Sequence, residues 1–99
     1  MGFDARVEPI RFEGQIRYWS PEKASGLAVV DVPAAGIAVL GGLKQQRVRG
    51  TLGGVEFVSN VAPAGGGRLA LTVSKALMAA ARVAVGDSVS VEITGTGRD

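Results

Sequence analysis

The sequence predicts a mainly β protein, a small closed six-stranded β-barrel with two short helices, arranged as a ββαβ-ββαβ pseudo-repeat. Three observations predict it: segments in which apolar and polar residues alternate, glycine at 15 of 99 positions, and a repeated order of elements. Alternation with a period of two is typical of strands with one buried face, and glycine supplies the turns between strands. A barrel is favoured because closure leaves no exposed sheet edge.

The first unit is expected to contain three strands and one helix. Its strands show alternation or a short apolar run bounded by turn residues, and they span residues 10–18, 27–32 and 47–52. Pro33 suits the first turn of a helix, and Gly41 with Gly42 ends that helix. Ile37 and Leu40 lie three positions apart and give the helix one apolar side.

The second unit repeats this order. Its strands are expected over residues 55–61, 68–73 and 88–94. Gly53 and Gly54 predict a tight antiparallel turn before the first of these strands, and residues 63–67 are expected to form a loop. Ser74 predicts the cap of a second helix over residues 75–82.

Sliding the chain by about 41 residues without a gap aligns the two units. Val30 then falls on Leu71, and the start of one helix falls on the start of the other. The prediction is that residues 26–52 superpose on residues 67–93 and that the two copies interlock about a pseudo-twofold axis. The alternative is a coincidence of loop lengths, because any two βαβ stretches with similar loops align in this way.

The composition excludes several kinds of chemistry. The sequence contains neither cysteine nor histidine, which rules out disulfides, thiolate nucleophiles, Ser-His-Asp and Cys-His hydrolysis and ordinary zinc sites. We therefore expect no metal and no cofactor. The formal net charge of +2 is low for a surface that binds phosphates, so nucleic acid is not the favoured partner.

The size and hydropathy of the chain predict one domain. We expect that domain to span residues 7–94, with residues 95–99 as a flexible tail. No apolar run approaches the roughly 20 residues that cross a bilayer, and the first residues lack the apolar core of a secretory signal. The expected location is therefore the cytoplasm, without a membrane partner.

Several short motifs, mostly turns and strand ends, occur in a characteristic order: GLAVVDVP at 26–33, RGTLGGVEFVS at 49–59, GRL at 67–69, VSKAL at 73–77 and VGDSV at 85–89. Together they resemble the small bacterial family called domain of unknown function nineteen-oh-five, from about residue 10 to residue 94. The resemblance implies a closed β-barrel, found alone or ahead of a bacteriocin-protection (YdeI/OmpD-associated) domain, and no established activity. Relatives often carry Arg or Lys within the segment that corresponds to Leu77 to Ala81, whereas this chain has Met78-Ala79-Ala80-Ala81 there, so the resemblance implies no role for a basic residue in this segment.

Tyr18 and Trp19 are the first candidate site, because an amphipathic aromatic pair at the end of a strand suits a recognition surface. The alternative is that Trp19 covers one end of the barrel core. Arg68 follows three glycines, Gly65 to Gly67, which suggests a loop that binds an anion through backbone N–H groups and a guanidinium. The alternative is a plain flexible hairpin.

Three charged residues are the other candidates. Arg47 and Arg49 share one face of a strand and suit a phosphate or carboxylate, although such a pair is more often a solvated strand face. Asp31 lies in an apolar strand, where a buried carboxylate needs a partner. The alternative for Asp31 is that it faces outward or caps the helix at Pro33.

Three functions follow in order of preference. The first is a non-catalytic module that binds a small molecule or a protein partner in the loops or the mouth of the barrel. The second is a nucleic-acid-binding regulator of the swapped-hairpin type, which Val73 to Leu77 and Val85 to Val89 resemble. The third is a cofactor-free enzyme in which Asp31 or Tyr18 acts as an acid or base. The ligand, the partner and the oligomeric state are not identified by the sequence.

Overall fold

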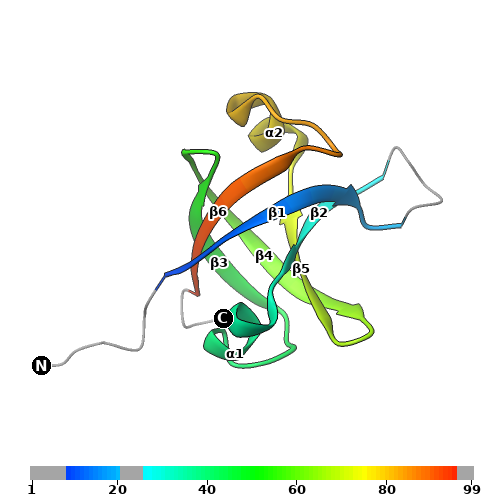
Figure 1. Cartoon of the computed structure of the whole chain (residues 1–99), viewed down its shortest axis with the longest axis vertical. Coiled ribbons are helices and arrows are strands. Elements are labelled where there is room, and N and C mark those ends of the chain that lie inside the picture. The colour runs from blue at the N-terminus through cyan, green and yellow to red at the C-terminus, as the bar shows by residue number, and fades with distance from the viewer. Residues whose placement is uncertain (1–8, 21–25, 96–99) are drawn as a thin grey trace, which may run out of the picture.

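Alternating side chains along six strands build a closed barrel (Figure 1). The computed structural model describes residues 9–20 and 26–95. Its strands are β1 (Ile10–Tyr18), β2 (Ala28–Val32), β3 (Gln46–Leu52), β4 (Val55–Gly65), β5 (Arg68–Val73) and β6 (Ser88–Gly95). Around the ring they follow the order β1-β2-β5-β4-β3-β6, and each neighbouring pair is antiparallel. The predicted fold class is confirmed.

The strand registers agree with the predicted repeat. Val30 of β2 pairs with Leu71 of β5, and Thr51 of β3 pairs with Glu92 of β6, with partners 41 residues apart in both cases. The ring order also stays the same when β1, β2 and β3 are exchanged with β4, β5 and β6. A pseudo-twofold axis therefore passes through both pairs, and the repeat is not a coincidence of loop lengths.

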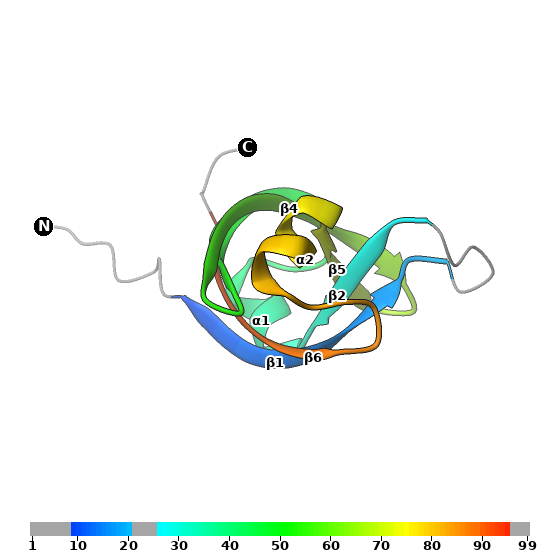
Figure 2. The same ribbon diagram turned by 90° about the horizontal axis from the view of Figure 1, so that it is seen from above.

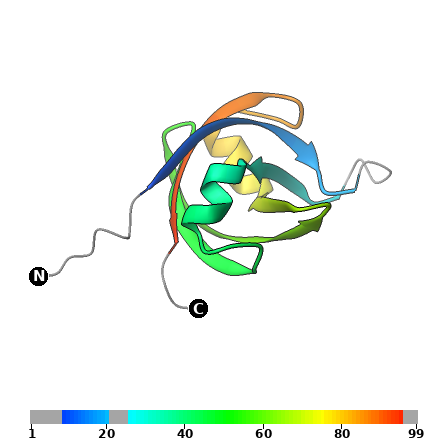
Figure 3. The ribbon, with the colours of Figure 1, turned by 60° about the horizontal axis from the view of Figure 1, so that its bottom comes forward.

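Two short helices lie at opposite ends of the barrel, as Figures 1 and 3 show. They are α1 (Ala34–Val39) and α2 (Lys75–Ala81). The Ser74 hydroxyl accepts a hydrogen bond of 3.0 Å from the Leu77 backbone N–H and so caps α2 as predicted. Pro33 is the N-cap of α1, one residue earlier than the predicted first turn. No helix within residues 9–20 and 26–95 is long and apolar enough to cross a membrane.

The core consists of the inward-facing residues of the six strands together with residues from the helix ends. Its fully buried larger side chains are Ile16, Leu52, Leu69, Leu71, Ile93, Val30, Val48, Val61 and Val73. Gly50 of β3 faces the same way as Val48 and Leu52, and a Cβ atom there would overlap the backbone carbonyl of Glu92. Glycine is therefore required where β6 crosses close to β3.

The predicted loop over residues 63–67 is wrong in its extent. β4 continues through Pro63, which pairs with Leu69, and a register shift between Pro63 and Gly65 marks a β-bulge. A bulge accommodates proline because the ladder is interrupted there. The turn itself is only Gly66 and Gly67, whose φ angles of +61° and +76° suit a tight hairpin turn. Residues 21–25 of the predicted loop at 19–26, and residues 96–99 of the predicted tail, lie outside the described residues.

Candidate functional site

The registers of β1, β2 and β5 place three side chains in one row at the α2 end of the barrel. Tyr18 pairs with Ala28, and Ala28 pairs with Val73. All three occupy inward-facing positions of their strands. In each strand this is the inward-facing position nearest to the α2 end of the barrel. Tyr18 therefore stands at the mouth of the barrel, beside the point where the chain leaves β5 and enters α2.

A pocket of about 550 Å³ opens at this mouth, which α2 covers in Figure 2. We call it the mouth pocket. It is lined by Tyr18, Gly26, Leu27, Ala28, Val73, Ser74, Lys75, Met78 and Val85. These residues come from β1, β2, β5, α2 and the segments next to them, so walls from distant parts of the sequence enclose the same space. The volume lies within the range of small-molecule sites, and barrel mouths are a common place for them.

The polar side chains of the mouth pocket are Tyr18, Ser74 and Lys75. Within the described part of the chain, the Tyr18 hydroxyl and the Lys75 ammonium group have no hydrogen-bond or ion-pair partner. The Ser74 oxygen accepts from Leu77, and its hydroxyl proton stays available. None of the described residues that line the pocket has a carboxylate side chain. Hydrogen-bond donors therefore stand against an apolar wall that includes Leu27 and Met78.

Trp19 lies next to this pocket but does not line it. Its backbone N–H donates a hydrogen bond of 2.7 Å to the Leu27 carbonyl, which holds the ends of β1 and β2 together. The residue is 39% exposed and is not part of the buried core. The alternative in which Trp19 is a core lid is therefore not supported by its exposure.

Asp31 faces outward and is bound by an arginine that the sequence analysis did not single out. Nε of Arg17 donates to Oδ2 of Asp31, and a terminal guanidinium nitrogen donates to Oδ1, both at 2.8 Å. The hydrogen bonds from Arg17 lower the pKa of Asp31, and the charges of Arg17 and Arg68 lower it further, while partial burial opposes them. Asp31 thus stays ionised and has a partner.

Arg68 lies at the start of β5, at the end of the β2–β5 pair opposite to Trp19. Arg68 lies next to the pairing of Val32 with Leu69, which is at one end of the β2–β5 ladder. The pairing of Ala28 with Val73 is at the other end of this ladder, where the mouth pocket and Trp19 lie. Five residue steps along β5 span about 17 Å. The structure does not bring Trp19 and Arg68 into one site.

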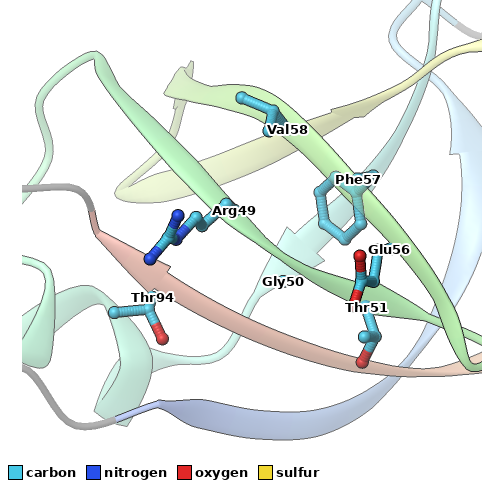
Figure 4. Close-up of a pocket in the computed structure, with 7 residues that line it drawn as sticks. All are labelled: Arg49, Gly50, Thr51, Glu56, Phe57, Val58 and Thr94. Atoms are coloured by element: carbon cyan, nitrogen blue, oxygen red, sulfur yellow. The ribbon is translucent and has the colours of Figure 1, made fainter.

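Arg47 and Arg49 lie on the outer face of β3, which is across the ring from β2. Arg49 lines a shallow depression of about 530 Å³ with Thr94 of β6 and Val58 of β4, and Figure 4 shows it. The depression is built on adjoining strands of one sheet surface, so it lacks walls from other elements. The candidate residues thus lie in three separate places. Tyr18 and Trp19 lie at or beside the mouth pocket, Asp31 and Arg68 lie on β2 and β5, and Arg47 and Arg49 lie on β3.

Leu27, Lys75 and Met78 were not among the predicted site residues. Lys75 and Met78 were predicted to belong to the second helix, but nothing in their spacing shows that this helix faces Tyr18. The register of Tyr18 with Ala28 and Val73 supplies that information. A pairing of β2 with β5, which follows from the repeat, is the signal that would have found them.

Comparison with known protein families gives one match. The family described as "Domain of unknown function (DUF1905)" matches residues 12–93, which is most of the chain. It is the family whose motifs the sequence resembles. The second domain that the resemblance implies stays a prediction. A search of the curated proteins found no match.

Proposed function

The chain belongs to the DUF1905 family, whose description assigns no activity, and we propose that it is a non-catalytic module that binds a small molecule in the mouth pocket. The observation that carries the proposal is the convergence of β1, β2, β5 and α2 on one space of about 550 Å³. Convergent walls exclude water from several sides of a ligand, which a single sheet surface does not.

The exposed apolar surface supports this position. Leu27 is 49% exposed although it continues the apolar run of β2, and Met78 is only partly buried against the core. Methionine adapts its shape to different ligands because its side chain is unbranched and flexible. A bound apolar group would remove both side chains from water, which is favourable at about 25 cal/mol for each Å² buried.

The state of Asp31 supports a non-catalytic role for that residue. A general acid or base works best when its pKa lies near the working pH, whereas hydrogen bonds from Arg17 lower the pKa of Asp31. The carboxylate is also held by two bonds, which a proton transfer would have to break. Of the two residues considered for acid-base chemistry, only Tyr18 lines the mouth pocket.

The basic side chains do not support the nucleic-acid alternative. Arg47 and Arg49 lie on β3, across the ring from β2, whereas Arg68 lies on β5 next to β2. Phosphate binding gains most when cations gather on one face. We therefore do not propose a nucleic-acid ligand.

A screen of small neutral and charged fragments by two-dimensional amide NMR tests the proposal. Fragments that bind should shift the amide signals of Leu27, Lys75 and Met78. The variant Met78→Trp fills the mouth pocket and should abolish these shifts. The matched variant Val58→Trp introduces the same indole side chain at an exposed position, in the depression lined by Arg49 and Thr94, and should retain them. Shifts that survive in Met78→Trp, or the absence of any binding fragment, would overturn the proposed function.

A further inference from the structure

We propose that the ligand of the mouth pocket is a small anion with an apolar body, with a carboxylate as its charged group. This inference rests on the proposed function and names the ligand class of the same pocket. It is carried by the described residues that line the pocket: they form an apolar wall, include three side chains that can donate hydrogen bonds, and include no acidic side chain.

The donors define the charge of the ligand. Lys75 has an ammonium group with three N–H donors, and Tyr18 and Ser74 each have one O–H group. Neither Lys75 nor the Tyr18 hydroxyl is paired with another residue in the part of the chain that the structure describes. A carboxylate supplies acceptors for all three donors and a charge opposite to that of Lys75. An ammonium ligand would instead find no anionic side chain among the described residues of the lining.

The pseudo-twofold axis provides an internal comparison. At the α1 end, Leu69 pairs with Pro63 on one side and with Val32 on the other. Leu69 corresponds to Ala28 in the repeat, so Pro63 takes the place of Tyr18, and Val32 takes the place of Val73. The displacement of 41 residues places Pro33 and Ala34 at the positions of Ser74 and Lys75. Each of the three donors is therefore replaced by a residue without a side-chain donor.

The α1 end is also closed by packing. The buried Gly36 of α1 lies so close to Val32 and Ile10 that a Cβ atom would be 2.8 Å and 3.0 Å from their methyl groups. The same fold thus builds one tightly packed end, whose three equivalent positions have no side-chain donor, and one end with a pocket and three donors. The donors at the mouth pocket do not follow from the barrel architecture, and a ligand that needs them accounts for their presence there.

The test compares three probes that share one apolar body: 4-phenylbutyrate, its neutral amide and the amine 4-phenylbutylamine. Dissociation constants come from isothermal titration and from amide NMR shifts with the intact chain. We expect the carboxylate to bind about tenfold more tightly than the amide, the factor expected when a charge-assisted hydrogen bond replaces a neutral one. The amine should bind more weakly than either. Raising the salt concentration should weaken carboxylate binding and leave amide binding unchanged.

Two lysine variants complete the test. Lys75→Gln should reduce the affinity for 4-phenylbutyrate to that for the amide, whereas Lys44→Gln, at an exposed lysine that does not line the mouth pocket, should leave it unchanged. Equal binding of all three probes at Leu27 and Met78 would overturn the anion inference and leave the proposed function standing. Preferred binding of the amine would also overturn the inference. Binding of no probe of any charge would count against both.

Discussion

Arg17 and Asp31 form a two-pronged ion pair across β1 and β2, with both nitrogen-to-oxygen distances at 2.8 Å. Arg17 also donates to the backbone carbonyls of Tyr18 and Trp19, at 3.0 Å and 3.5 Å. One guanidinium therefore joins the outer face of β2 to the end of β1 where the mouth pocket opens. The pair holds Tyr18 in place without lining the pocket itself.

The first prediction concerns pH. The native pKa of Asp31 is lowered, so its ion pair contributes stability that is fully present above the unfolded-state pKa of about 4 and is lost as the pH falls through the lower native pKa. Asp31→Asn should cost about 1 kcal/mol at pH 7, because both partners are partly exposed. Urea unfolding of both proteins at pH 7, 4 and 2.5 measures this. A cost that is unchanged at the lowest pH would show that the charge of Asp31 does not stabilise the fold.

The second prediction concerns Gly50. An alanine there would place its Cβ atom on the Glu92 carbonyl, which is backbone and cannot move without separating β3 from β6. Gly50→Ala should therefore destabilise the protein by about 3 kcal/mol or more. Gly36→Ala is the matched control, since its new methyl group meets only the side chains of Val32 and Ile10. Thermal and urea unfolding should rank Gly50→Ala as clearly worse, and the reverse order would contradict the proposed reason.

The third prediction concerns the cap of α2. Ser74→Ala removes the oxygen that accepts from the Leu77 N–H and should cost about 1 kcal/mol. Ser90→Ala, at an exposed position of β6, should change stability by less than about 0.5 kcal/mol. Chemical denaturation of the two variants measures both values. Equal effects would show that the cap does not stabilise α2.

The fourth prediction separates the two interpretations of Trp19. The side chain is 39% exposed, so Trp19→Ala should cost less than about 2 kcal/mol. A residue that covers the core would cost about 3 to 5 kcal/mol when truncated. The melting temperature and the free energy of unfolding in urea measure the loss. A value in the higher range would restore the interpretation of Trp19 as a core lid.

The strand pattern shows how much of the fold was predictable. β1 and β5 begin and end where alternation predicted, because Ile10 to Tyr18 and Arg68 to Val73 each have one consistent inward face. β4 was predicted too short, since Pro63 was interpreted as a loop signal. A proline ends a strand only where its missing N–H is needed, and the bulge at Pro63 removes that need.

The site was less predictable than the fold, because it depends on contacts between distant segments. Tyr18 was a candidate because it is aromatic and ends a strand, and the structure places it at the mouth pocket. Arg17, which binds Asp31, alternates with apolar residues like any solvated strand residue. Only the pairing of β1 with β2 brings the two together. Arg49 and Arg68 were separate candidates for binding an anion, and the ring order places β4 between their strands.

The central claim is that a ligand binds at the α2 end of the barrel. Isotope-filtered NMR with labelled protein and unlabelled 4-phenylbutyrate tests that position directly, because it detects protons of the two molecules that lie close together. We predict cross-peaks from the phenyl ring to the Met78 methyl group and to the Leu27 methyl groups, and none to the methyl groups of Val58. Cross-peaks to Val58 without any to Met78 would place the ligand in the depression lined by Arg49 and Thr94, and would contradict binding in the mouth pocket.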